Sequence, residues 1–151
     1  EVDAVDLDGR IITFKPEEMK MGYRQSVFQE NKMTVVSARV ALRYSKKYLI
    51  KARMQELADS RARKQPLDKP SAGSVFRRPE GYYVGPMVEK LGLKGFQIGG
   101  AKVSKKHAGF IINAGNATAA DVIALIEEIQ LRARQEFGVD LQTEIRIVGE
   151  E

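Results

Sequence analysis

The chain has 151 residues, of which 43% are hydrophobic, and a net charge of +5. This length fits one soluble domain, or one domain with a piece of another. The lack of cysteine excludes disulfides and thiolate metal sites, and a single histidine argues against any other transition-metal site. No apolar run approaches the roughly 20 residues that cross a bilayer, so no membrane is expected. Basic residues are interleaved with acidic ones, which favours surface solvation first, a small anionic ligand second and nucleic acid third.

The first part of the chain predicts β structure. Residues 2–14 predict a hairpin, because apolar and polar residues alternate on both sides of Asp8-Gly9, a dipeptide typical of tight turns. Residues 33–44 alternate again and predict a strand. The apolar residues that would share one face of this strand are Val36, Ala38, Val40 and Leu42.

Residues 46–62 change to a helical period and predict an amphipathic helix. Its apolar stripe consists of Ile50, Met54, Leu57 and Ala58. The last turn is basic, with Arg61, Arg63 and Lys64. Cations at a helix C-terminus are favoured by the helix dipole alone, so this cluster has a structural explanation as well as a functional one.

Two prolines, Pro70 and Pro79, bracket a run of small residues followed by Val75 and Phe76, and this segment is a candidate for ligand contact. Small residues there allow close backbone approach to a ligand, and Gly73 permits a positive φ. Val75 and Phe76 would anchor the segment in a core. The plainer interpretation is a tight turn that leads into a strand, since no Gly-x-Ser-x-Gly pattern surrounds Ser74.

The remaining elements predict an α+β fold, because strands and helices mix without regular alternation. A short helix should begin near Pro86 and end before Gly92, and residues 110–112 should form a strand. A long helix should run from an N-cap at Thr118 to Gly138. The stripe expected to be buried is Val122, Ile126, Ile129, Ala133 and Phe137. The chain should close on a strand, residues 141–149, with Ile145 and Ile147 facing inwards.

The residues alone leave two functions open. The cations, Ser74, Glu144 and His107 suit an enzyme that acts on an anionic substrate, or a non-catalytic module that binds phosphate or RNA. The scarcity of interleaved aromatic residues counts against RNA. His107 on its own fits a hydrogen-bonded structural histidine, and the glycine-rich stretch 92–109 contains no dinucleotide or triphosphate loop pattern.

Several blocks, taken in order, resemble the C-terminal half of the UDP-N-acetylenolpyruvoylglucosamine reductase family. The blocks cover nearly the whole chain, and they are Gly22-Tyr23-Arg24-Gln25-Ser26-Val27-Phe28, Lys64-Gln65-Pro66-Leu67, Pro70-Ser71-Ala72-Gly73-Ser74-Val75-Phe76, Gly92-Leu93-Lys94-Gly95, Ile98-Gly99-Gly100-Ala101, Val103-Ser104, Lys106-His107-Ala108-Gly109-Phe110, Asn113, Ala117-Thr118, Asp121-Val122 and Leu141 to Arg146. The family consists of flavoenzymes that make UDP-N-acetylmuramate for the bacterial cell wall, so the resemblance implies a cytoplasmic oxidoreductase of peptidoglycan synthesis.

The resemblance implies three catalytic residues. NADPH reduces FAD, and the flavin then passes a hydride to C3 of the enolpyruvyl group of UDP-N-acetylenolpyruvoylglucosamine. Arg24 would stabilise the resulting enolate, Ser74 would protonate C2, and Glu144 would act as an acid or orienting group. The implied substrate-binding residues are Tyr23, Arg61, Lys64, Gln65, His107 and Arg146.

The resemblance also divides the chain. Residues 1–44 correspond to the end of the FAD-binding domain and residues 45–151 to the UDP-sugar-binding domain. Because the chain opens on Glu1 within an expected strand, we expect a piece of a longer protein that lacks most of the FAD site and does not turn over by itself. Arg78 stands where many relatives carry asparagine. No tyrosine-bearing insertion lies between Arg24 and Ser74, which favours a family branch with a less covered pocket.

Overall fold

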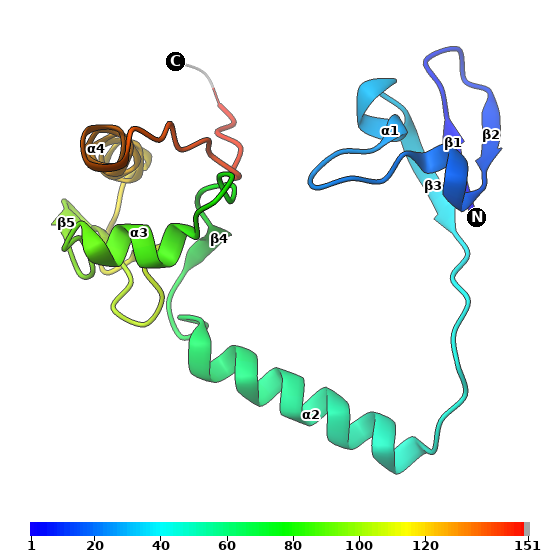
Figure 1. The fold of residues 1–151 in the computed structure, drawn as a ribbon, viewed down its shortest axis with the longest axis horizontal. Helices are drawn as coiled ribbons and strands as arrows, with labels where there is room; N and C mark the ends of the chain where they lie inside the picture. The colour runs from blue at the N-terminus through cyan, green and yellow to red at the C-terminus, as the bar shows by residue number, and fades with distance from the viewer. Residues whose placement is uncertain (150–151) are drawn as a thin grey trace. The chain divides into compact units, whose positions relative to one another are not determined.

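The computed structural model describes residues 1–149. The chain divides into two compact units, Glu1–Lys47 and Tyr48–Glu151. Antiparallel sheets are mixed with helices, so the predicted α+β class is confirmed (Figure 1). The assignment of residues 1–44 and 45–151 to a flavin part and a substrate part stays a prediction.

The first unit is built on a three-stranded antiparallel sheet in the order β2-β1-β3. Its elements are β1 (Val2–Val5), β2 (Ile11–Phe14), the 3-10 helix η1 (Pro16–Met19), α1 (Val27–Glu30) and β3 (Thr34–Ala38). The predicted hairpin is confirmed as β1 and β2, and Gly9 in its turn has φ +82°, a conformation that favours glycine.

The first unit has a small core and a polar clamp across its sheet. The core consists of Ala4, Met19, Val27 and Phe28, with Phe14 edge-on to Phe28. On β1, the Asp3 carboxylate accepts hydrogen bonds from the hydroxyls of Thr13 on β2 (2.6 Å) and Ser37 on β3 (2.7 Å). These two hydroxyls lower the pKa of Asp3, and the carboxylate ties all three strands together.

The strand predicted over residues 33–44 is too long. The observed β3 ends at Ala38, and Val40 and Leu42 are 73% and 83% exposed. Among the described residues β3 pairs only with β1, from Val5↔Thr34 to Val2↔Ala38, and residues 40–44 pair with no strand. An alternating pattern without a partner strand therefore stays extended and solvated.

Helix α2 (Lys47–Lys64) confirms the helix predicted over residues 46–62. None of its side chains is buried within this chain. Ile50, Met54 and Leu57 are between 46% and 65% exposed. Within the described residues the helix is supported by its own backbone hydrogen bonds and by residue types that favour helix.

The second unit contains a four-stranded antiparallel sheet in the order β4-β7-β6-β5. Its further elements are β4 (Ser71–Ser74), α3 (Val84–Lys90), β5 (Gln97–Ile98), β6 (Ala101–Val103), β7 (Phe110–Asn113) and α4 (Ala119–Phe137). α4 packs on the sheet through β5 and β6 and also contacts α3. A core between α4, α3 and the sheet includes Val88, Leu93, Val103, Leu125 and Ile129, all at most 1% exposed.

The signals that begin and end the helices of this unit are confirmed. The Thr118 hydroxyl accepts from the amide of Asp121 (3.1 Å), and the Asp121 carboxylate accepts from the amide of Thr118 (3.0 Å), which is the predicted capping box with aspartate in place of glutamate. α4 ends at Gly138 with φ +66°, and Gly92 follows α3 with φ +69°. Glycine adopts this left-handed geometry at the lowest cost.

The predicted buried stripe of α4 is confirmed for Ile126, Ile129 and Ala133. Val122 and Phe137 are only half-buried against the same core, and the prediction missed Leu125, which is fully buried. The short strands β5 and β6 lie inside the glycine-rich stretch 92–109 and were also not predicted.

The predicted final strand, residues 141–149, is wrong. One isolated bridge joins Thr143 to Phe76, and the chain then bends at Glu144 and Ile145, which ends the pairing. Ile145 packs against the core as expected, whereas Ile147 is 65% exposed. In the part of the chain that the structure describes, no helix is long and apolar enough to cross a membrane.

We predict that Gly100→Ala strongly destabilises the second unit. A Cβ at this position would lie 2.3 Å from the carbonyl oxygen of Gly115 and 2.4 Å from the amide nitrogen of Ala117, and backbone atoms cannot move aside as a flexible side chain can. Urea unfolding should show a loss of about 2 kcal/mol or more. Gly85→Ala is the matched control, because its Cβ would approach no atom closer than 3.5 Å. Equal stability of the two variants would contradict the contact.

We also predict an acid-dependent contribution from Asp121. Hydrogen bonds from the amides of Thr118 and then Gly100 lower the pKa of Asp121 below 3.8 in the fold. A lowered folded pKa means that this stabilisation is fully present above the unfolded value of 3.8 and is lost as the pH falls through the folded pKa.

The measurement is urea unfolding of the wild type and Asp121→Asn between about pH 5 and pH 2, followed by the amide signals of α4. The stability difference between the two proteins should shrink as the solution becomes more acidic. A difference that stays constant over this range would show that the charge of Asp121 is not what stabilises the cap.

Candidate active site

Ser74 is exposed at the end of β4, directly before two core residues. Val75 and Phe76 are 3% and 2% exposed, so the expected anchoring of this segment is confirmed. β4 carries one extra residue relative to β7: Ser71 pairs with Ile112 and Ser74 with Phe110, and Gly73 between them has φ +89°. This geometry is a β-bulge with glycine at the left-handed position.

The C-terminal segment lies beside the residues that follow Ser74. The amide of Glu144 donates to the carbonyl oxygen of Val75 (2.8 Å), and the amide of Arg77 donates to the carbonyl oxygen of Gln142 (2.8 Å). These bonds flank the bridge between Phe76 and Thr143. The backbone of half-buried Glu144 is thereby fixed next to the segment that carries Ser74.

His107 lies on the other side of this segment. Its Nδ1 accepts from the amide of Gly109 (3.1 Å), and its ring is edge-on to Phe110 with the centroids 5.0 Å apart. A Cβ at Gly109 would lie 3.1 Å from Cε1 of His107 and 3.8 Å from Oγ of Ser74, so both side chains border Gly109. With Nδ1 as acceptor, a neutral His107 carries its proton on Nε2 and can donate it to a ligand.

The Ser74 hydroxyl donates a long hydrogen bond, 3.5 Å, to the carbonyl oxygen of Phe76. A ligand oxygen would compete easily with so long a contact. The second unit therefore brings three predicted residues close together. They are Ser74 with its exposed side chain, His107 with its imidazole, and Glu144 through its backbone.

Tyr23 and Arg24 belong to the first unit, where they form the tip of a tight turn. The amides and carbonyls of Gly22 and Gln25 bond each other across this turn (3.0 and 3.4 Å). Arg24 has φ +58°, which is uncommon for a residue with a Cβ and carries backbone strain. Its guanidinium lies 5.4 Å from the centroid of the Tyr23 ring.

The predicted phosphate-binding residues Arg61 and Lys64 are exposed in the last turn of α2. Gln65 is half-buried, and its backbone amide donates to the carbonyl oxygen of Arg61 (2.8 Å). Arg146 is exposed on the C-terminal segment, two residues beyond Glu144. The structure gives the places of these four residues, and their roles remain predictions.

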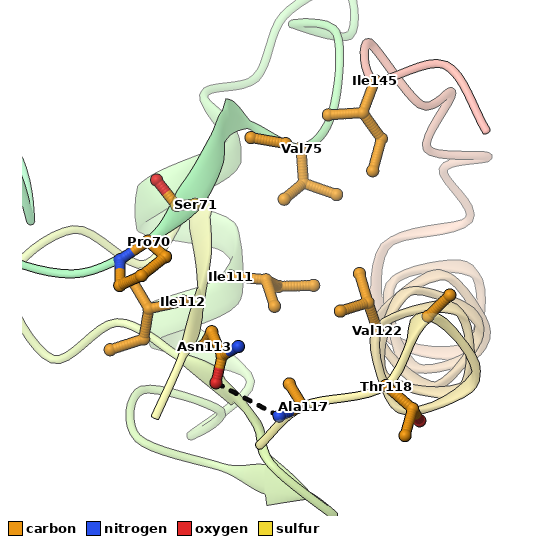
Figure 2. A pocket seen from close by; sticks show the side chains of 12 residues that line it. Pro70, Ser71, Val75, Ile111, Ile112, Asn113, Ala117, Thr118, Val122 and Ile145 are labelled. Atoms are coloured by element: carbon orange, nitrogen blue, oxygen red, sulfur yellow. Dashed lines mark hydrogen bonds between the residues drawn. The ribbon is translucent and has the colours of Figure 1, made fainter. Parts of the chain in front are cut away.

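A largely apolar hollow of about 420 Å³ lies between the sheet and the start of α4 (Figure 2). Val75, Ile111, Val122 and Ile145 form much of its wall. The side-chain oxygen of Asn113 accepts from the amide of Ala117 (3.1 Å), so this polar group already serves the fold. None of the predicted site residues lines this hollow.

Ser104 belongs to a block of the family resemblance, but the sequence did not predict that it is a buried polar residue, 1% exposed. Its Oγ accepts from the amides of Lys106 (3.1 Å) and His107 (3.3 Å) and so fixes the approach of the chain to His107. Among residues 1–149 no group of three His, Asp or Glu side chains could hold a metal ion.

Comparison with known proteins decides the family. Residues 65–148 match the family model described as UDP-N-acetylenolpyruvoylglucosamine reductase, C-terminal domain. The chain belongs to this family.

Relatives within the reductase family are similar over the whole chain. It is 56% identical over 151 residues to the UDP-N-acetylenolpyruvoylglucosamine reductase of Syntrophomonas wolfei and 51% identical over 150 residues to that of Caldanaerobacter subterraneus. These alignments cover 100% and 99% of this chain but 50% of each relative. The chain thus spans about half the length of the curated relatives it matches.

A solved reductase structure has the same fold. The enzyme from Thermus caldophilus matches with a TM-score of 0.79 and 33% identity, over 96% of this chain and 51% of the solved one. The named family and the α+β fold of the predicted resemblance are therefore confirmed.

Arg78, where the resemblance implies asparagine in many relatives of the reductase family, has its own structural partners. Its guanidinium lies 3.9 Å from the centroid of the Tyr83 ring, and its Nε donates to the carbonyl oxygen of Tyr82 (3.3 Å). Stacking and a backbone acceptor hold the guanidinium against the start of α3.

We predict that the strain at Arg24 can be measured with a pair of variants. Arg24→Gly and Arg24→Ala both remove the guanidinium, but only alanine retains a Cβ that disfavours φ +58°. Arg24→Gly should therefore be about 1 kcal/mol more stable than Arg24→Ala. Urea unfolding followed by amide signals of the first unit measures the difference, and an Ala variant as stable as the Gly variant would rule out strain.

Proposed function

We propose that this chain is the substrate-binding part of a reductase that converts UDP-N-acetylenolpyruvoylglucosamine to UDP-N-acetylmuramate in peptidoglycan synthesis. The observation that supports this most is the position of Ser74. In a chain of this family, its exposed hydroxyl stands beside His107 and next to the backbone-fixed segment of Glu144. The parent enzyme is cytoplasmic in this proposal.

The chemistry assigned to the chain is stabilisation of an anion and delivery of a proton. FAD, reduced by NADPH, supplies the hydride when bound in the parent enzyme. Arg24 stabilises the enolate of the substrate as an always-charged planar donor. Ser74 donates the proton to C2, and Glu144 orients the substrate or supplies a proton in turn.

Substrate binding falls to the remaining residues of the predicted set. Arg61 and Lys64 suit the diphosphate of the UDP-sugar, since guanidinium and ammonium groups form charge-assisted hydrogen bonds with phosphate oxygens. His107 offers Nε2–H to the substrate, because Nδ1 is engaged by Gly109. Tyr23, Gln65 and Arg146 complete the set.

Flavin binding and UDP-sugar binding are assigned to different parts of the chain in this proposal. Residues 1–44 are the end of the flavin-binding domain, and residues 45–151 bind the UDP-sugar. In this proposal the isolated chain binds a UDP-sugar without turnover. Sustained, substrate-dependent loss of NADPH absorbance after addition of FAD would contradict the second half of this statement.

We predict that UDP-N-acetylglucosamine binds the chain through the end of α2. Arg61→Gln with Lys64→Gln should weaken binding about tenfold, because two charge-assisted contacts to the diphosphate are lost. The control, Lys47→Gln with Lys51→Gln, removes the same charge from the other end of the helix and should change affinity less than about twofold.

Isothermal titration calorimetry of the three proteins gives the affinities, and a short RNA serves as the competing ligand. Tight RNA binding with no UDP-sugar binding would favour the non-catalytic RNA-binding module instead. Equal weakening by the two double variants would show that only net charge matters and would contradict the assigned contacts.

A further inference from the structure

The face of the sheet turned away from α4 contains a second hollow. On β6, Ala101 and Val103 belong to the core under α4, so Lys102 between them faces the opposite side. On β7, Ile111 belongs to that core and Ile112 lines the hollow. The volume is about 480 Å³, within the range of about 300–1,000 Å³ that is usual for small-ligand sites.

Lysine dominates the charge of this hollow. Lys69, Lys102, Lys105 and Lys106 line it, together with a single carboxylate, that of Asp68. Within residues 1–149, none of these four ammonium groups forms an ion pair. The hollow therefore has a surplus of positive charge without internal compensation, which concentrates anions there.

Two features show that part of the hollow is held in place. Ser104 lines it and is 1% exposed, and its Oγ already accepts from two amides. The Ser104 hydroxyl proton is thus left to donate to an acceptor in the hollow. The side chain of Lys105 lies along Gly95, where an added Cβ would be 3.0 Å from its Cε.

We propose that this hollow binds the diphosphate group of a small ligand. Four ammonium groups and a hydroxyl donor match the several negative oxygens of a diphosphate better than those of one phosphate or carboxylate. Pro66, Leu67 and Ile112 give the hollow apolar wall for the rest of the ligand. None of the residues assigned above to catalysis or to the UDP-sugar lines it, so this inference does not rest on the proposed function.

The test is a titration of the chain with inorganic pyrophosphate, followed by amide ¹H–¹⁵N NMR. Amides of residues 102–106 should shift, and inorganic phosphate should bind more weakly. The triple variant Lys102→Gln, Lys105→Gln, Lys106→Gln should lose about tenfold or more in affinity for pyrophosphate. The matched control, Lys46→Gln, Lys47→Gln, Lys51→Gln, removes equal charge elsewhere and should bind like the wild type.

Two further arms identify the source of the diphosphate. NADP⁺ and UDP-N-acetylglucosamine are titrated separately into the chain and into the double variant Arg61→Gln, Lys64→Gln. A shift of the 102–106 amides that persists in the double variant supports this hollow as a site of its own and names its ligand class. The proposal is overturned if pyrophosphate shifts none of these amides, or if both triple variants weaken binding equally. It is also overturned if a short RNA displaces pyrophosphate through the same lysines, because the surface is then a nucleic-acid contact.

Discussion

Two hydrogen bonds at one residue hold the candidate site of the second unit together. The amide of Val75 donates to the carbonyl oxygen of Gly109 (3.0 Å), and its carbonyl oxygen accepts from the amide of Glu144 (2.8 Å). Val75 thus joins the sheet on one side to the C-terminal segment on the other, while its side chain is buried in the core. Segments that are distant in the chain meet because one buried residue satisfies both of its backbone groups.

This arrangement separates the rigid part of the site from the exposed part. The two residues after Ser74 are packed in the core, and Ser74 itself is left at the surface. On the other side of Gly109, Ser104 holds the amides of both Lys106 and His107. Ser104 therefore lines the lysine-rich hollow and also fixes the backbone of His107. The hollow and the candidate active site of the second unit thus share this residue. Functional side chains on segments supported in this way need little reorganisation when a ligand arrives.

The sequence was sufficient wherever a local signal decides the structure. Asp8-Gly9 predicted the hairpin turn, Thr118 and Asp121 predicted the start of α4, and Gly92 predicted the end of α3, since turns and caps depend on a few neighbouring residues. It failed where structure depends on a distant partner. Residues 39–44 and 141–149 alternate like strands but lack a ladder, whereas β5 and β6 exist because neighbouring strands pair with them.

The candidate site was predictable in composition but not in geometry. Ser74, His107 and Glu144 came from an ordered family resemblance, and no sequence pattern states that Gly109 lies between the first two. The structural role of Ser104 was not predicted, because a buried serine that accepts from two amides looks like any loop serine in the sequence. The exposure of the apolar stripe of α2 was not predictable either, because periodicity shows which side chains share a face and only packing shows whether that face is covered.

The extra residue at Gly73 determines the direction in which the Ser74 hydroxyl points. Strand side chains alternate between two faces, so adding or removing one position reverses every later side chain relative to its partner strand. Without the bulge, Ser74 would be shifted by one position relative to β7. Its hydroxyl would then point to the opposite face of the sheet. The face on which Ser74 lies is therefore decided by the number of residues in β4. Substituting side chains without changing that number would not reproduce its orientation.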